Sequence, residues 1–90
     1  MKIVLSNNFS TSLDIILDYI SKDDIKVAIQ FNKALKKAIK SIPNFPYKSR
    51  KSIYHSDDNI RDFIFKGYTI SYLVDNNKIV LLDIFKWMNK

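Results

Sequence analysis

Hydrophobic and polar residues alternate along three runs in the last third of the chain, residues 60–66, 68–74 and 78–85. Each run is rich in Ile, Val, Phe and Tyr, which favour a half-buried pleated surface. The short gaps between the runs contain Gly67 and the sequence Asp75-Asn76-Asn77, both typical of tight turns. We therefore expect an antiparallel meander whose middle strand has one apolar face, formed by Tyr68, Ile70, Tyr72 and Val74, and one mixed face, formed by Thr69, Ser71 and Leu73.

In the first part of the chain, the apolar residues recur with the period of an α-helix. The opening residues MKIVL predict a short strand, and a helix is expected to begin at Ser10 or Thr11, where Thr11 and Asp14 fit a capping box. Its apolar residues recur at helical spacing, at Leu13, Ile16, Leu17 and Ile20.

A second helix is expected after residues 21–24, and Pro43 and Pro46 end it. Its predicted apolar stripe consists of Ala28, Phe31, Leu35, Ala38 and Ile42, with most of its lysines off the stripe. Two adjoining amphipathic helices form a hairpin that can cover one side of a sheet. The predicted fold class is α+β, in the order β-α-α-β-β-β. Residues 44–59 are an ambiguous connector with a candidate short strand at 52–54.

The length and composition limit the kinds of site that the chain can build. Ninety residues predict a single domain, 1–90. The chain has no cysteine and one histidine, so we expect no disulfide, metal site or cofactor. No apolar run approaches the ~20 residues of a membrane helix and no secretory signal is recognised, so a cytoplasmic protein without a membrane partner is expected.

The formal charge of +6 suggests an anionic partner. All nine acids are Asp, however, and 13 of the 15 basic residues are Lys, a composition that the codon bias of an A+T-rich genome also produces. Charge alone therefore does not separate nucleic acid from an acidic protein segment.

In this order and spacing, several fragments resemble the RelE/ParE superfamily of bacterial type II toxin-antitoxin toxins. In the first half they are Leu17-Asp18-Tyr19-Ile20, Ala28, Phe31, Leu35, Ala38-Ile39 and Phe45-Pro46; in the second half they are Ile60-Arg61-Asp62, Gly67-Tyr68-Thr69-Ile70, Tyr72 and the run 79–84. The resemblance spans nearly the whole chain and implies a growth-inhibiting toxin, a role in plasmid stabilization and neutralisation by a cognate antitoxin protein. It implies no small-molecule substrate.

The superfamily includes two activities. The helical hairpin is closer to ParE, which implies a poison that binds DNA gyrase without catalysis. The alternative is a RelE-like endoribonuclease that cuts mRNA on the ribosome, which needs cations at the scissile phosphate and a group that moves protons. Arg61 and Lys86 are the catalytic candidates under this alternative. The chain has no Glu, and its tail lacks the His or Tyr that many ribonuclease members carry there. The remaining proton-transfer candidates are His55, Tyr54 and Asp57, or Lys86 if it were deprotonated.

The candidate target-binding residues are Tyr19 and, in the second half of the chain, Lys48, Arg50, Lys51, His55, Lys86 and Trp87. Each has a structural interpretation as well. Arg61 is expected to contribute to toxicity and little to folding, but it is equally able to pair with Asp62 or Asp83. The basic cluster at 48–51 and His55 fit a solvated loop, and Trp87 fits a lid on the core as well as a stacking platform.

A third hypothesis is a small basic nucleic-acid binding domain without a toxin role. It would show steep salt dependence and no partner preference. The chain contains no helix-turn-helix glycine turn, aromatic RNP-type motif or zinc-ligand spacing in its support.

Overall fold

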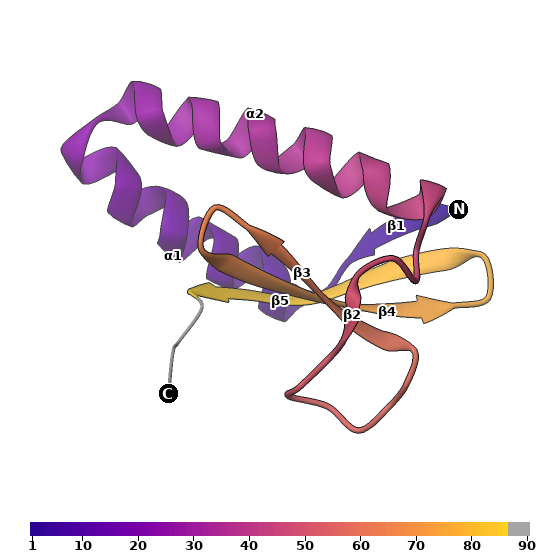
Figure 1. Cartoon of the computed structure of the whole chain (residues 1–90). Coiled ribbons are helices and arrows are strands. Elements are labelled where there is room, and N and C mark those ends of the chain that lie inside the picture. Colours follow the sequence, from indigo (N-terminus) through magenta and orange to yellow (C-terminus); the bar gives the residue numbers. More distant parts are fainter. Residues whose placement is uncertain (87–90) are drawn as a thin grey trace.

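The computed structural model describes residues 1–86 and confirms the predicted β-α-α-β-β-β order, with a two-residue strand and a 3₁₀ turn added in the connector (Figure 1). The elements are β1 (Lys2–Leu5), α1 (Asn7–Asp23), α2 (Ile25–Ser41), η1 (Ile42–Asn44), β2 (Arg50–Lys51), β3 (Ile60–Phe65), β4 (Tyr68–Asp75) and β5 (Lys78–Lys86). Trp87 lies outside the described residues.

The five strands form one sheet in the order β1-β5-β4-β3-β2. β1 runs parallel to β5, and the other neighbours are antiparallel, as the meander predicts. The turn between β3 and β4 has positive φ at both Lys66 (48°) and Gly67 (83°), which is the requirement of a type I′ hairpin. A bulge interrupts the β4–β5 ladder, because Ser71 pairs with Asp83 whereas Tyr72 pairs with Leu81.

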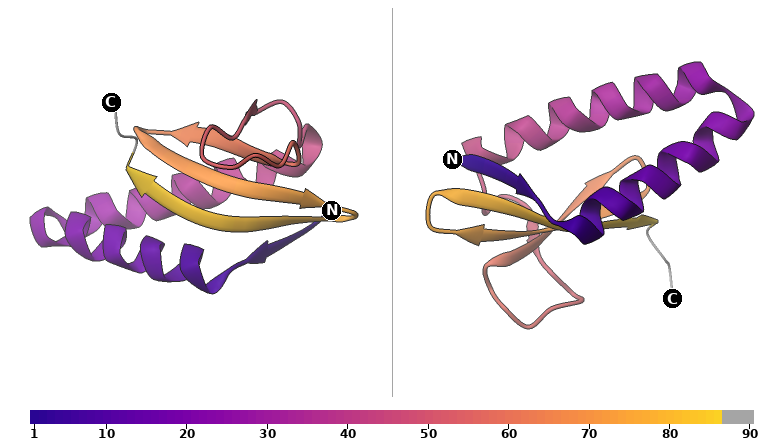
Figure 2. Two further views of the ribbon diagram at one scale, coloured as in Figure 1. Left: turned by 90° about the horizontal axis from the view of Figure 1, so that it is seen from below. Right: turned by 180° about the vertical axis from the view of Figure 1, so that it is seen from behind.

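Both helices cover the same face of the sheet (Figures 1 and 2). The core between them is built from α1, α2, η1, β4 and β5, with Phe9, Phe31, Leu35, Ile39, Ile42, Ile70, Tyr72, Val74, Ile79, Leu81 and Ile84 buried. The ring of Phe31 on α2 meets Phe65 and Tyr68 edge-on, at centroid distances of 5.6 and 5.4 Å. The apolar face predicted for β4 is therefore the core face.

The first helix begins earlier than the sequence predicts, and the expected capping box at Thr11 and Asp14 is wrong. Ser6 is the N-cap, and its hydroxyl accepts a hydrogen bond from the Phe9 amide at 3.1 Å. The same hydroxyl donates to the Leu82 carbonyl of β5 at 2.8 Å. The cap is thus fixed by a residue 76 positions away, and the chain enters α1 directly from β1.

Two smaller predictions also need correction. Ile39 is buried on the core stripe of α2, whereas the expected Ala38 is only half-buried, because the helix presents the larger side chain to β1 and β5. The short connector strand is β2, at 50–51, and not 52–54. After Lys51 pairs with Arg61, the Ser52 amide makes one more bond to Ile60 and the chain leaves the ladder.

Three polar residues on the face of the sheet opposite the helices are buried. Asp62, Thr69 and Ser71 are at most 2% exposed. The loop 52–59 lies on this side (Figure 2), and Tyr54 from the loop packs edge-on against Phe85 at 5.0 Å. The mixed face predicted for β4 is therefore covered by the connector.

Candidate functional site

A groove of about 450 Å³ opens between α1 and the ends of β4 and β5; we call it the α1–β5 groove. Its lining is mainly apolar, with one cation: Ser12, Ile15, Ile16, Tyr19, Tyr68, Ile84, Phe85 and Lys86. Ile15 and Tyr19 are 65% and 68% exposed, far more than core residues of an amphipathic helix. The groove therefore combines exposed apolar surface with the side chain of Lys86.

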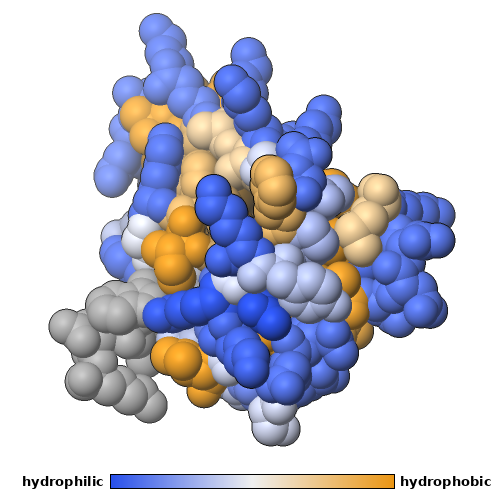
Figure 3. Space-filling model, turned by 45° about the vertical axis from the view of Figure 1, so that its right-hand side comes forward, coloured by the Kyte–Doolittle hydropathy of each residue, from blue (hydrophilic) through white to orange (hydrophobic). Residues whose placement is uncertain are grey.

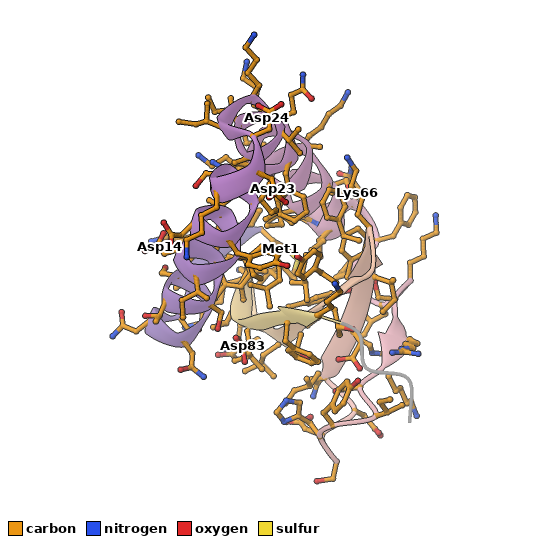
Figure 4. The ribbon with its side chains drawn as sticks, turned by 90° about the vertical axis from the view of Figure 1, so that its left-hand side faces the viewer. Met1, Asp14, Asp23, Asp24, Lys66 and Asp83 are labelled. Carbon is orange, nitrogen blue, oxygen red and sulfur yellow. The ribbon has the colours of Figure 1, made fainter. Side chains whose placement is uncertain are left out.

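Ser12, one of the lining residues, connects the helix and the strand that border the groove. Ser12 of α1 donates a hydrogen bond of 2.6 Å to the Asp83 carboxylate of β5, next to the bulge. Figure 4 looks onto this end of the molecule, with Asp83 on β5 below α1 and Asp14 on the outer side of the helix, pointing away from the sheet. The short serine and aspartate side chains therefore fix α1 to β5, while the longer apolar residues remain at the rim.

Arg61 occupies the other end of the sheet, where it binds the connector. Its guanidinium donates to the backbone carbonyls of Asp58 (3.1 Å), Tyr47 (3.4 Å) and Ser49 (3.3 Å), and it lies 4.8 Å from the centre of the Tyr47 ring. The expected carboxylate partners are wrong: Asp62 faces the opposite side, and Asp83 accepts from Ser12. Arg61 therefore has a structural role that the sequence pattern does not reveal.

Tyr72 lies beside Arg61 in the β3–β4 ladder and anchors the same connector. Its side chain is completely buried, and its hydroxyl donates to the Pro46 carbonyl at 2.5 Å. Burial raises the pKa of the Tyr72 hydroxyl above 10.0, while Ser49 and the charge of Arg61 act in the opposite direction. The phenol is therefore protonated at neutral pH and already engaged as a donor.

The predicted basic cluster is brought close to Arg61 but is partly paired. β2 aligns Arg50 with Asp62 and Lys51 with Arg61. Arg50 forms an ion pair of 3.9 Å with the buried Asp62, and Lys51 forms one of 3.6 Å with the exposed Asp58. Lys48 lines a second groove of about 460 Å³ between η1, β3 and β4. His55 is exposed in the loop 52–59 on the far side of the sheet.

The structure does not bring Arg61 and Lys86 together. Arg61 on β3 pairs with Tyr72 of β4, whereas Lys86 on β5 pairs with Tyr68 of β4. The two residues therefore lie on opposite sides of β4 and are offset by four residues along it. Ordinary strand dimensions separate these two backbone positions by about 16 Å. A single scissile phosphate needs its cations within a few ångströms, whereas the Arg61 guanidinium is directed to the connector carbonyls, so this arrangement does not favour a shared phosphate site.

Sequence reasoning missed several residues of these surfaces. Tyr68 and Phe85 were recognised only as strand residues, and Asp62 only as a possible partner of Arg61. Their role depends on the path of the connector and on how far β5 extends past the end of β1. The spacing of hydrophobic residues along the sequence does not predict either feature. Tyr19 was found, because a tyrosine off the apolar stripe of α1 predicts exposure.

Residues 1–86 provide neither a metal site nor a membrane-spanning helix. No group of three or more His, Cys, Asp or Glu side chains is arranged there to hold a metal ion. No helix in that range is long and apolar enough to cross a membrane.

A helical hairpin lies on one face of a mostly antiparallel sheet in the order β-α-α-β-β-β, which is the fold of ParE-like toxins. The sequence profile described as "ParE toxin of type II toxin-antitoxin system, parDE" matches residues 3–86. The chain therefore belongs to the ParE toxin family and is a type II toxin.

The solved structures agree on the fold. The chain is similar to one in the structure titled "Chromosomal ParDE TA system from P. aeruginosa", with a TM-score of 0.79 and 16% sequence identity. The match covers 96% of this chain and 95% of the other. No curated protein sequence matches the chain.

Proposed function

We propose that this chain is a cytoplasmic growth-inhibiting toxin that binds DNA gyrase and is neutralised by a cognate antitoxin, in a module that stabilises the plasmid or chromosomal region carrying it. The observation that carries the proposal is the α1–β5 groove on a chain of the ParE family. Its exposed apolar wall and the lysine at its end suit an amphipathic segment with acidic residues, which orders as it binds.

The arrangement of the cations favours a binding poison over a nuclease. The guanidinium of Arg61 is engaged with three carbonyls, and Lys86 lies at the far end of the sheet. Tyr72, which pairs with Arg61 in the β3–β4 ladder, is fully buried and donates to Pro46, so it is poorly placed to accept a proton from a ribose hydroxyl. Binding to gyrase requires none of these groups to perform acid–base chemistry.

The target is tested with purified protein in two parallel assays. We expect inhibition of gyrase supercoiling and intact ribosome-bound message. Cleavage of that message by the wild-type chain, lost in Arg61→Ala and in Lys86→Ala with gyrase unaffected, would replace this proposal with the RelE-like activity.

The antitoxin site is tested with a matched pair of exposed isoleucines. Ile15 lies in the α1–β5 groove and is 65% exposed, and Ile25 lies outside that groove and is 64% exposed. Ile15→Asp introduces a charge that repels an acidic segment, so co-expressed antitoxin should no longer relieve growth arrest. Ile25→Asp should remain fully neutralised. If both variants are rescued equally well, the antitoxin binds elsewhere.

A further inference from the structure

Helix α2 carries five lysines and no acidic residue along its 17 residues: Lys26, Lys33, Lys36, Lys37 and Lys40. All five are exposed. At 100° per residue, their positions fall within an arc of about 100° on the side away from the buried residues of the helix. We call this row the α2 lysine stripe, and it runs for about 21 Å along the helix.

Composition alone does not explain the stripe. α1 has the same length, comes from the same chain and packs on the same sheet, but it carries three Asp and one Lys. A general excess of lysine codons would affect both helices alike. Within the helical hairpin, the acidic residues lie on α1 and at the hairpin tip, where Figure 4 shows Asp14, Asp23 and Asp24.

The stripe has no acidic partner within the described part of the chain. The lysine ion pairs found there involve Lys22, Lys51 and Lys78, none of which is on α2. In Figure 3 the top of the molecule, where α2 lies in Figure 1, carries projecting hydrophilic side chains. Five unneutralised charges in one row repel each other, and a polyanion lying along the row would relieve that repulsion.

The residue types on the stripe indicate which kind of polyanion it is suited to bind. Protein interfaces are enriched in aromatic residues and arginine and depleted in lysine, and proteins that bind single strands stack bases on aromatic rings. The stripe has neither an aromatic residue nor an arginine; the exposed rings of the described chain belong to α1 and the connector. Lysines alone suit the regularly spaced phosphates of a duplex, which are contacted without reference to sequence.

We propose that the α2 lysine stripe binds the phosphate backbone of double-stranded DNA. The stripe lies on α2, whereas the lining of the α1–β5 groove comes from α1, β4 and β5, so the two surfaces are separate. The proposal does not depend on the gyrase and antitoxin proposals, because the α2 lysine stripe belongs entirely to this chain and its DNA binding can be measured without either partner.

The test measures fluorescence anisotropy of a labelled 30-base-pair DNA duplex with purified full-length protein over a range of salt concentrations. Lys33→Gln, Lys37→Gln and Lys40→Gln are combined in one variant. The control combines Lys2→Gln, Lys66→Gln and Lys78→Gln, which are exposed and remove the same charge from other elements. Thermal melts establish that both variants are folded.

We expect the stripe variant to lose about tenfold or more in affinity at low salt, and the slope of log K against log salt to fall by about 2.7, which is 0.9 for each of three phosphate contacts. The control should change affinity less than twofold. Equal losses of DNA affinity in the two variants would show that binding depends on net charge and not on the stripe, and would overturn the proposal. Tighter binding of a double-stranded RNA of the same sequence, or displacement of DNA by equimolar poly-glutamate, would also overturn it.

Discussion

The two faces of the sheet are buried by different means. Under α1 and α2, the strands present Ile70, Val74, Ile79 and other apolar side chains that pack without directional bonds. On the opposite face, Asp62 and Ser71 are buried by the connector and satisfied by hydrogen bonds, with Ser71 donating to Asp62 at 2.8 Å and the Ile53 amide donating at 3.2 Å. The stability of the first face depends on buried apolar area and not on individual hydrogen bonds. The second face depends on each hydrogen bond, because a buried polar group that loses its partner destabilises the fold.

The difference shows how a small domain holds a long irregular segment. The loop 52–59 has few apolar residues to bury, and one carboxylate inside the sheet provides its attachment point. Bonds from Arg61 and Tyr72 fix the same connector from the helix-facing side. The connector is thus anchored on both faces, although only one face has an apolar core.

The largest effect is expected in the apolar core. Leu35 on α2 is completely buried, so Leu35→Ala should lower the free energy of unfolding by about 2–5 kcal/mol in urea melts. Ile64 on the opposite face is 46% exposed and provides the control. Ile64→Ala should change stability by less than about 0.5 kcal/mol. Similar losses at the two sites would contradict the assignment of the core to one face.

A smaller effect is expected from removing the buried carboxylate. Asp62→Ala leaves the Ser71 hydroxyl and the Ile53 amide without their acceptor, which should cost about 1–3 kcal/mol. Hydrogen exchange at the Ile53 amide should also become faster. Asp58→Ala removes an exposed carboxylate that pairs with Lys51, and it should have little effect. An Asp62→Ala variant with unchanged stability and exchange would show that the loop is held by other contacts.

The anchoring by Arg61 is expected to be weaker, because that side chain is half-exposed. Arg61→Ala should lower the free energy of unfolding by about 1–2 kcal/mol and make residues 45–59 more sensitive to proteolysis. Gyrase inhibition should be measured at a temperature where the variant is folded. Full stability combined with lost toxicity would instead support the sequence-based prediction that Arg61 contributes to toxicity and little to folding.

The smallest change concerns the Tyr72 hydroxyl. Tyr72→Phe removes the bond to Pro46 and should cost about 1 kcal/mol at neutral pH. The folded state holds the phenolic proton more tightly than the unfolded chain, because the pKa is raised above 10.0. This stabilisation is complete below pH 10.0 and is lost as the pH rises through the folded-state pKa. The free energy of unfolding, measured in urea melts between pH 9 and 12, should therefore decrease more steeply for wild type than for Tyr72→Phe. Parallel curves would contradict the raised pKa of Tyr72.

Local periodicity is sufficient to predict the hairpin and the meander, since the apolar residues of α2 and β4 recur at the helical and strand periods. It fails where a residue is fixed by a distant part of the chain. Ser6 caps α1 while bound to Leu82, and Asp62 is buried because the connector crosses over it. Arg61 is satisfied by three carbonyls whose positions depend on the same connector. The α1–β5 groove likewise follows from tertiary placement and not from a motif.

The parallel pairing of β1 with β5 has a consequence for synthesis of the toxin. Lys2 aligns with Lys78 and Leu5 with Leu81, so the first strand joins the sheet only after the last strand exists. These contacts join opposite ends of the chain and have a high closure entropy, which delays their formation during folding. A translation product that stops before β5 lacks both the site for β1 and the lower wall of the α1–β5 groove. Completion of the groove is therefore a late event in folding, and the antitoxin proposed to bind there would bind only after β5 has been made.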